Sequence, residues 1–409
     1  MPEANRKIAF DRVLLTPDYL ADPYRFYAEL REKVPVYFSQ RMNAWVLTQY
    51  HDVAAGLCDK RLICGRRVES YAAGLPLPLR EAVRPLFEHL EKWIDNMDPP
   101  DHTRLRALVN KAFTPHMVQE LAPAVEKIID QLLDVAGSKG QMEFIRDFAY
   151  PLPATVIASM LGVPAEDQSR FIGWANSIAA YSGTGKAEPA KTEAAWQSVS
   201  ALNTYFHALA EQRRMHPQKD LISTLVVLEE MGDRLTEEEL IAMCVFLLVA
   251  GHETTMALLA NGLLSLLRNP EQACALQGNP GLARTAVEEF LRYESPIQHE
   301  TRVTAEPVEY RGVRIEEGQR VVLMIGSANR DPAIFHNPDT LDITREPNKH
   351  LAFGYGIHYC LGAPLARLEA QIAFGKVLAR FPQMRLKSEN LEWRIHTSHR
   401  NPVFMQVVW

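Results

Sequence analysis

Cysteine is scarce in this chain of 409 residues, which holds an odd number, five. The cysteines are scattered and lack the spacing of a zinc site, so the sequence argues against a disulfide framework and against structural zinc. We expect a reduced compartment, in which at most one cysteine carries chemistry. The five are Cys58, Cys64, Cys244, Cys274 and Cys360.

An excess of positive charge and a terminal hydrophobic segment are also lacking. The 44 lysines and arginines face 50 aspartates and glutamates, and the resulting net charge of -6 argues against nucleic-acid binding. The start of the chain, Met1 to Lys7, is polar and charged, with neither a secretory stretch nor a membrane anchor. The sequence therefore predicts a soluble cytoplasmic protein of bacterial type.

Linkers are lacking as well. The chain has no Gly/Ser-rich run, low-complexity segment, internal repeat or long charge block, which favours a single domain over residues 1–409. With 47% hydrophobic and 23% charged residues, it can bury a core large enough to hide a cofactor. The Gly-x-Gly-x-x-Gly fingerprint of flavin and nicotinamide sites does not occur, so electrons for any redox chemistry should come from another protein.

Helix signals dominate the chain and strand signals are short. Asp22-Pro23 predicts the start of a helix that runs to about Glu32, and residues from about 115 to 267 are mostly helical in pattern. We expect breaks at Pro151-Leu152-Pro153 and at Gly183 to Pro189. The fold class is therefore mainly α with small antiparallel sheets. The expected strands are Val34 to Phe38, Ala44 to Thr48, Val308 to Arg314, Arg320 to Ile325, and part of Leu391 to Trp409.

The longest predicted helix begins at Thr236, which has capping-box spacing to Glu239, and ends at Asn269-Pro270. At 1.5 Å per residue it spans roughly 50 Å. Its apolar middle leads into Ala250-Gly251-His252-Glu253-Thr254-Thr255. Burying such polar groups costs several kcal/mol without partners, and Gly251 suggests a local opening of the helical hydrogen bonds. Alternatively, the polar face meets solvent.

A glycine-rich loop delivers one cysteine to the start of another predicted helix, Ala363 to Leu378. The loop is Phe353-Gly354-Tyr355-Gly356-Ile357-His358-Tyr359-Cys360-Leu361-Gly362. The helix dipole and nearby N–H groups favour a thiolate at Cys360, which makes it a candidate metal ligand. The glycines would let the backbone approach a flat cofactor closely. The alternative is a small buried hydrophobic residue.

Two charged pairs have helical spacing. Glu289 and Arg292 lie one turn apart, as do His102 and Arg106 after Pro99-Pro100. Spacing alone is weak support, because a surface pair is worth only about 0 to 1 kcal/mol. The spacing of Glu289 and Arg292 also recurs at Glu3/Arg6, Glu81/Arg84, Glu143/Arg146, Glu211/Arg214 and Glu317/Arg320.

These segments together resemble the cytochrome P-450 family. The cysteine loop matches Phe-x-x-Gly-x-His/Arg-x-Cys-x-Gly at every fixed position, and residues 250–254 look like the oxygen-activating stretch Ala/Gly-Gly-x-Asp/Glu-Thr. Glu289 to Arg292 is similar to the Glu-x-x-Arg motif, in the expected order along the chain. The resemblance implies the P-450 fold, with haem b sandwiched between a long distal helix and a proximal cysteine loop, and Cys360 as axial thiolate ligand.

The resemblance also implies roles for individual residues. Thr254 and Glu253, with Gly251 and Ala250, would serve dioxygen binding and proton delivery. Arg345 would be the third member of the network of Glu289 and Arg292, with Arg330 as a nearby competitor. The implied haem contacts are His102, Arg106, Arg302 and His358 at the propionates, and Phe353, Gly354 and Gly362 at the loop.

The implied activity is insertion of one oxygen atom from O2 into a hydrophobic small molecule, such as a polyketide, macrolide, terpenoid or fatty-acyl compound. A ferredoxin or flavodoxin with its reductase would supply electrons, and an acidic ferredoxin would find positive charge at Arg104, Arg106, Lys111, Lys349 and Arg367. The alternatives are a peroxide-driven peroxygenase and a non-catalytic haem sensor. The expected substrate pocket includes Phe246, Val249, Ile297 and Gln298.

Overall fold

The computed structural model describes residues 10–73, 75–181, 188–230 and 235–409. The chain forms two compact units, each built from separate stretches of sequence. The sheet unit comprises residues 10–63, 129–150 and 254–409, and the helical unit comprises residues 64–128 and 151–253.

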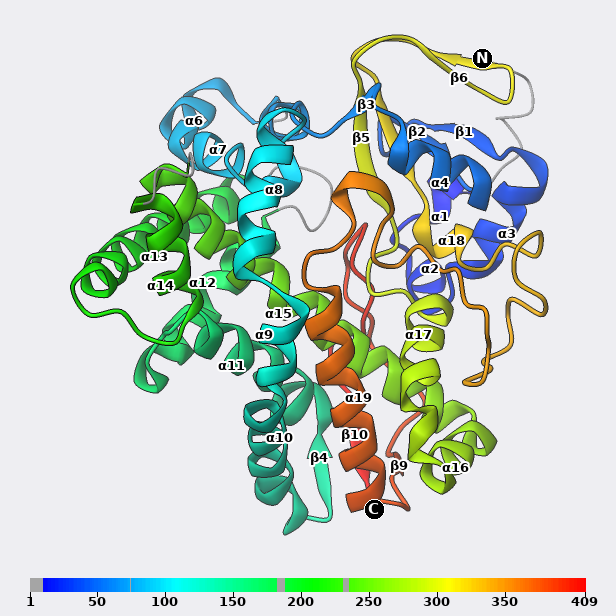
Figure 1. Ribbon diagram of the computed structural model, residues 1–409. Coiled ribbons are helices and arrows are strands. Elements are labelled where there is room, and N and C mark those ends of the chain that lie inside the picture. Colours follow the sequence, from blue (N-terminus) through cyan, green and yellow to red (C-terminus); the bar gives the residue numbers. More distant parts are fainter. Residues whose placement is uncertain (1–9, 74, 182–187, 231–234) are drawn as a thin grey trace. The chain divides into compact units, whose positions relative to one another are not determined.

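All strands among the described residues belong to the sheet unit (Figure 1). The largest sheet has the order β1-β2-β8-β5-β3, formed by β1 (Val36–Ser39), β2 (Ala44–Leu47), β3 (Leu62–Ile63), β5 (Glu300–Thr304) and β8 (Arg320–Leu323). The pairing of β2 with β8 is parallel, so this sheet is mixed and not wholly antiparallel as the sequence suggested. The remaining strands are β4 (Gln141–Glu143), β9 (Arg385–Leu386) and β10 (Gln406–Val408) in one sheet, and β6 (Val308–Tyr310) and β7 (Val313–Ile315) in another.

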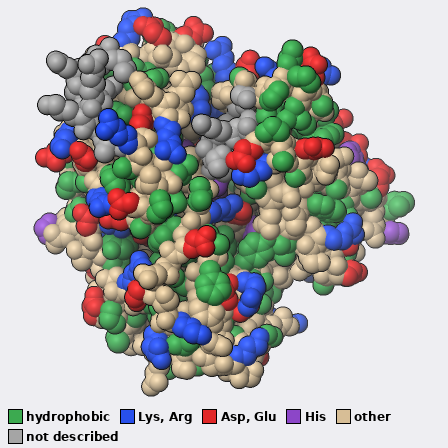
Figure 2. All heavy atoms as spheres, turned by 180° about the vertical axis from the view of Figure 1, so that it is seen from behind, with side chains coloured by type: hydrophobic (Ala, Val, Ile, Leu, Met, Phe, Trp, Pro, Cys, Tyr) green, Lys and Arg blue, Asp and Glu red, His purple; other side chains and the backbone are tan. Residues whose placement is uncertain are grey.

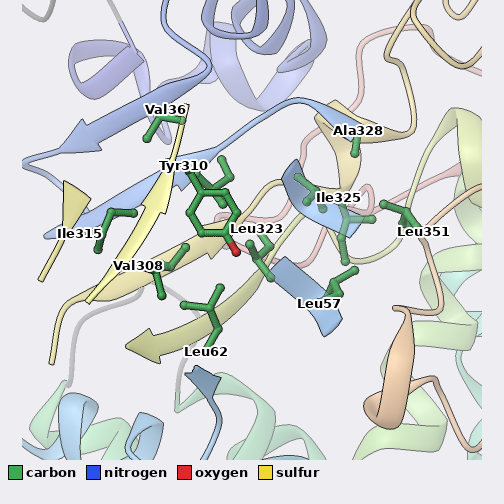
Figure 3. Packing of buried hydrophobic residues seen from close by; sticks show 13 residues of the cluster. Val36, Leu57, Leu62, Val308, Tyr310, Ile315, Leu323, Ile325, Ala328 and Leu351 are labelled. Carbon is green, nitrogen blue, oxygen red and sulfur yellow. The ribbon is translucent and has the colours of Figure 1, made fainter. Parts of the chain in front are cut away.

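The segment Val308 to Arg314, which the sequence predicted as one strand, is a hairpin. Arg311 and Gly312 have positive φ angles of 53° and 76° and turn the chain between β6 and β7. Tyr310, Val308 and Ile315 of this hairpin gather with Leu323 of the large sheet in one apolar cluster (Figure 3). Apolar burial of this kind is the main stabilising contribution to the sheet unit.

The helices of the sheet unit flank these strands. The helix predicted to start at Asp22-Pro23 begins one residue later, at Tyr24, with Pro23 at the N-cap position, and Asp22 Oδ1 accepts from the Tyr24 N–H at 3.0 Å. The helices that lie wholly in the sheet unit are α1 (Phe10–Val13), α2 (Pro17–Ala21), α3 (Tyr24–Lys33), α4 (Tyr50–Cys58), η3 (Ile145–Ala149), α16 (Pro270–Gly278), η5 (Pro280–Leu282), α17 (Ala283–Tyr293), α18 (Ile325–Ala328), η6 (Gly356–His358) and α19 (Ala363–Arg380).

The helical unit is built from helices alone among its described residues. Pro151 begins a helix where the sequence predicted a break, because proline is tolerated in a first helical turn. Most of the predicted break at Gly183 to Pro189 lies outside the described residues. The helices are α5 (Arg67–Ala72), α6 (Leu77–Ala82), α7 (Arg84–Leu90), η2 (Ile94–Asn96), α8 (Asp101–Ala112), α9 (Pro115–Glu120), α11 (Pro151–Met160), η4 (Ala165–Asp167), α12 (Gln168–Ala180), α13 (Pro189–Met215) and α14 (Leu221–Glu230).

Two helices contribute to both units, α10 (Ala122–Gly137) and α15 (Glu237–Arg268). The capping box of α15 is present, because Thr236 N donates to Glu239 Oε2 at 3.0 Å and Glu239 N donates to Thr236 Oγ1 at 3.2 Å. Of the described helices only α15 is long and apolar enough to cross a membrane, with a mean hydropathy of 1.7 in its most apolar window. Because 72% of that window is buried inside the protein, α15 has the character of a core helix.

On the face shown in Figure 2, basic and acidic side chains are interspersed. This mixing accords with the small net charge of -6. A face of this kind presents no broad positive field to a nucleic-acid backbone.

Gly262 lets α15 approach α17 and α19 closely. A Cβ atom at position 262 would collide with Phe374 Cζ and would lie 2.9 Å from Phe290 Cδ2. The two phenyl rings are buried and meet edge to face, with centroids 4.8 Å apart. They have little room to move, because a protein interior is close-packed.

We expect Gly262→Ala to lower the free energy of unfolding by about 1 to 3 kcal/mol through overpacking. Gly375→Ala is the matched control, since a Cβ atom at this second helical glycine would meet nothing within 4 Å. It should be neutral or stabilising by up to about 1 kcal/mol, because alanine is the better helix former. Thermal unfolding of both variants measures the difference, and equal midpoints would contradict the close approach.

Candidate active site

The cysteine loop is held by its own main chain. Cys360 N donates to Phe353 O at 2.9 Å, and Gly354 N donates to Leu351 O at 2.8 Å. Gly354 and Gly356 have φ angles of +72° and +75°, which residues other than glycine rarely adopt. The sequence pattern therefore encodes this loop locally.

Gly356 is also required by its surroundings. A Cβ atom there would lie 3.0 Å from Cys58 Sγ and 3.2 Å from Leu57 O, both at the end of α4. The loop thus rests directly on α4, within the sheet unit. A side chain at position 356 would push it away.

Cys360 differs from the cysteines that serve packing. It is exposed, whereas Cys64 and Cys244 are buried, and burial raises the pKa of the Cys244 thiol strongly. Cys360 lies just before α19, where the positive end of the helix dipole favours a thiolate. A Cβ atom at Gly362 would lie 3.9 Å from Cys360 Sγ, so the glycine keeps space beside the sulfur.

The pair at the centre of the predicted network, Glu289 and Arg292, is completely buried. Arg292 Nε and Nη2 donate to the two carboxylate oxygens of Glu289, each at 2.8 Å, and neither side chain has any exposed surface. Asn348 Nδ2 and the Asp342 N–H also donate to Glu289, at 3.1 and 2.9 Å. The remaining guanidinium donors of Arg292 reach the main-chain carbonyls of Asn329, Pro338 and Thr340. Every strong donor in this network has an acceptor, as a buried ion pair requires.

Arg345 is the second arginine on Glu289, with Nε 3.1 Å from Oε2. Its competitor Arg330 donates instead to the Tyr293 carbonyl and to Asp339. Sequence proximity could not separate the two. The tertiary structure distinguishes them, because it brings Arg345 and not Arg330 into contact with Glu289.

A second carboxylate, Glu288, was missed by the sequence analysis. It is bound by Arg367 of α19, through two hydrogen bonds of 2.7 and 2.8 Å, and by His350 at 3.0 Å. Arg367 in turn contacts Phe353 and Tyr359 of the cysteine loop. The only sequence signal was an adjacent pair of acidic residues on one helix.

The polar segment of α15 is continuous helix from Ala250 to Thr255. Glu253 is buried and Thr254 is half-buried. Gly251 does not interrupt the helix, contrary to the predicted local opening. It lies against Ile157 of α11, where a Cβ atom would come within 3.2 Å of Cδ1 and Cγ1. Close helix packing therefore accounts for this glycine.

The four predicted propionate ligands divide between the units. His102 and Arg106 lie one turn apart on α8, and burial together with the nearby Arg106 charge lowers the pKa of His102. Arg302 on β5 is buried, and its hydrogen bonds to Thr301 O at 2.9 Å and Glu300 at 3.4 Å both use Nη1. His358 lies in η6 of the cysteine loop.

The predicted pocket residues have different surroundings. Phe246 contacts Trp93 within the helical unit, with the rings tilted by 56° and their centroids 5.5 Å apart, and Val249 is three residues further along α15. In the sheet unit, Ile297 pairs with His399 in an isolated bridge. Gln298 donates to Ser295 O at 2.7 Å and to the Tyr24 hydroxyl at 3.4 Å, so its amide nitrogen is engaged within the protein.

Two of the basic residues expected to attract an electron donor are paired internally. Arg104 binds Glu239 within the helical unit, and Arg367 binds Glu288 within the sheet unit. Lys349 and Lys111 are exposed. Both lysine side chains therefore reach the protein surface.

Residues of the sheet unit suit iron protoporphyrin IX. Cys360 offers an exposed thiol at a helix start, and glycines keep the adjoining backbone free of side chains. Because the hydrogen bonds of Arg302 among the described residues use Nη1 only, its Nε and Nη2 can donate to a carboxylate such as a propionate.

Residues 78–279 and 281–398 match the cytochrome P-450 family. The chain belongs to this family. It is 43% identical over 380 residues to a biotin-biosynthesis cytochrome P-450 of Bacillus subtilis (strain 168), with 92% of this chain and 93% of the relative covered. Identity to the cytochrome P-450 monooxygenase PikC of Streptomyces venezuelae is 40%, over 91% of this chain and 87% of PikC.

Solved P-450 structures share the fold. A crystal structure of P-450 BioI in complex with acyl carrier protein ligated by hexadec-9Z-enoic acid aligns with a TM-score of 0.89 and 40% identity, and covers 96% of this chain and 100% of that chain. The bacillaene polyketide synthase P-450 PksS of Bacillus subtilis 168 aligns with a TM-score of 0.86 and 36% identity, over 96% and 98%.

These findings identify the enzyme class. The protein is a cytochrome P-450 monooxygenase, a haem-thiolate enzyme with a cysteine axial ligand. Relatives named as monooxygenase and hydroxylase favour this activity over the sensor that the sequence left open.

Proposed function

We propose that Cys360 is the axial ligand through which this P-450 binds and activates its haem. The observation that carries the assignment is the exposed thiol at the start of α19, in a loop shaped by Gly354, Gly356 and Gly362. A haem with a thiolate ligand supplies activation of dioxygen and transfer of one oxygen atom to the substrate. Phe353 and Gly354 form the start of the loop beside the cofactor.

Thr254 and Glu253 are the proposed proton-delivery residues. They are adjacent in α15, and Glu253 is a buried carboxylate that follows the apolar stretch Met243 to Ala250 of the helix. A buried ionisable group in a core helix is costly and is commonly functional. Thr254 Oγ1 would hold a proton delivered by way of Glu253 on the side of the helix that faces the cofactor, while Ala250 and Gly251 would keep the helix surface small.

His102, Arg106, Arg302 and His358 are the proposed partners of the two propionates. Arginine donors suit carboxylates because two N–H groups of one guanidinium can bind both oxygens. The buried Arg302 has such donors. His102 would contribute a neutral N–H, since burial lowers its pKa.

The proposed substrate is a hydrophobic acyl or polyketide-type molecule, in contact with Phe246, Val249, Ile297 and Gln298. Support comes from relatives: one is named for biotin biosynthesis, one is a polyketide-synthase P-450, and one structure contains a fatty-acyl carrier protein. Comparing oxidation of a free C16 fatty acid with that of the same chain on acyl carrier protein would separate free from tethered substrates.

Separate electron donors complete the proposal. A ferredoxin or flavodoxin with its reductase would deliver electrons to a single cytoplasmic haem domain spanning residues 1–409. Support comes from the absence of a flavin or nicotinamide fingerprint in the sequence. Lys349 and Lys111 offer exposed charge to an acidic donor.

Thr254→Ala tests this function most directly. We expect the variant to bind haem and substrate normally but to form less product per electron pair consumed, by on the order of 10-fold, because directed protonation is lost. The missing reducing equivalents should appear as hydrogen peroxide. Product, NAD(P)H consumption and peroxide are measured together on a substrate that the wild type oxidises.

Turnover driven by added peroxide provides the control, because it bypasses dioxygen activation and should suffer less. Wild-type coupling in Thr254→Ala would contradict the proton-delivery role. A wild-type enzyme that forms product with peroxide but never with a reductase system would favour the peroxygenase.

A further inference from the structure

Arg367 clamps the cysteine loop from α19. Its guanidinium carbon lies 4.5 Å from the ring centroid of Phe353, and Nη1 donates to the Tyr359 hydroxyl at 3.1 Å. These residues are the first aromatic side chain of the loop and the immediate neighbour of Cys360. Cys360 N also donates to Phe353 O. One guanidinium thus contacts the loop at its first residue and at the residue immediately before the ligand position.

Glu288 orients this guanidinium. Arg367 Nε and Nη2 donate to Glu288 Oε1 and Oε2 at 2.7 and 2.8 Å, a two-point contact that fixes the plane of the group. Only 28% of the Arg367 side chain and 21% of the Glu288 side chain are exposed, so solvent screens the pair weakly.

His350 ties Glu288 to the loop backbone. The Ala352 N–H donates to His350 Nδ1 at 3.2 Å, and a backbone N–H can only donate. The ring proton is therefore on Nε2, which donates to Glu288 Oε2 at 3.0 Å. The main chain at Ala352, just before Phe353, is thereby connected through His350 to Glu288. The same carboxylate also binds the Arg367 guanidinium.

Glu288 belongs to a different network from its neighbour Glu289. Successive helical residues point about 100° apart, so the two carboxylates of α17 serve different partners. Glu289 binds Arg292 and Arg345, while Glu288 binds Arg367 and His350. Burial raises the pKa of Glu288, but the hydrogen bonds from Arg367 and His350 outweigh it and hold the pKa at about 2.

We propose that Glu288 is a positioning residue for the haem ligand: through Arg367 and His350 it holds Phe353 and Tyr359, and with them the Cys360 thiolate, in the geometry for ligation. This inference rests on Cys360 being the ligand and goes beyond it, because it assigns the control of ligand geometry to a carboxylate outside the Glu289 network. It also explains why Arg367, which the sequence analysis took for a surface charge, binds Glu288 and the cysteine loop inside the protein.

Glu288→Gln is the main test, since it keeps the shape and removes the charge. We expect haem to bind, but a several-fold larger fraction of the reduced carbon monoxide complex should lack the red-shifted Soret band of a thiolate ligand. The midpoint potential should shift to more positive values, because a negative charge beside the ligand loop is lost. Tyr359→Phe removes one acceptor of Arg367 and should produce a smaller change in the same direction.

Asp134→Asn is the matched control, because Asp134 pairs with Arg380 on the same helix α19 but both side chains are more than half exposed. It should leave spectrum and potential unchanged. A wild-type spectrum and potential in Glu288→Gln, with only a lowered unfolding temperature, would overturn the proposal. Should Glu288→Gln fail to fold, Tyr359→Phe decides in the same way.

The spectrum of the wild-type protein distinguishes a failure of the Glu288 proposal from a failure of the Cys360 assignment on which it rests. If wild-type protein lacks the thiolate Soret band, the assignment of Cys360 fails. If the wild type shows the band and Glu288→Gln keeps it unchanged, only the role of Glu288 fails.

Discussion

Cys360→Ser is expected to abolish the red-shifted Soret band of the reduced carbon monoxide complex and to reduce reductase-driven product formation to background. A serine hydroxyl is a harder and far less acidic ligand than a thiol, so it cannot supply the thiolate that favours cleavage of the O–O bond. Absorption spectra of the reduced protein with carbon monoxide, recorded at equal haem concentration, measure the loss.

Cys58→Ser is the matched control for this substitution. Cys58 is also exposed and lies against the same loop, since a Cβ atom at Gly356 would be 3.0 Å from its sulfur. The variant should keep the thiolate spectrum. An unchanged spectrum in Cys360→Ser, or its loss in Cys58→Ser instead, would contradict the ligand assignment.

Glu289→Ala should give little soluble, haem-loaded protein. The substitution leaves Arg292 buried without its carboxylate, and breaking a fully buried pair costs about 3 to 5 kcal/mol. That is a large fraction of the stability of a typical domain. The yield of soluble protein, its haem content and its unfolding temperature are the measurements.

Glu211→Ala removes a pair with the same spacing, Glu211 and Arg214, in which the glutamate side chain is 63% exposed. An exposed pair contributes under about 1 kcal/mol, so this variant should behave like the wild type. Equal yield and haem content in both variants would show that burial of Glu289 does not matter.

Local patterns predicted the elements that depend on their own residues. Thr236 and Glu239 specify the start of α15 because each caps a nearby backbone N–H group. Likewise, Gly354 and Gly356 specify the bends of the cysteine loop, because their φ angles are accessible to few other residues. The family resemblance added the cofactor and the enzyme class.

Other features were wrong or missing because they depend on distant partners. Gly251 was taken as the sign of a local opening of the helical hydrogen bonds, yet its neighbour is Ile157 of another helix. The strand predicted from Val308 to Arg314 is a hairpin that turns at Arg311 and Gly312, and its apolar residues pack in a cluster built from several segments. A one-dimensional pattern contains neither neighbour.

The sequence by itself determined the cysteine loop, the capped long helix and the Glu-x-x-Arg turn, since their residues interact within a few positions of one another. Only the tertiary structure decided that Arg345 and not Arg330 reaches Glu289, that Gly262 makes room for Phe374, and that Glu288 binds Arg367. Glu288 and Arg367 are 79 residues apart. Such contacts form only when packing brings distant segments together, and charge and shape then select among the partners that arrive.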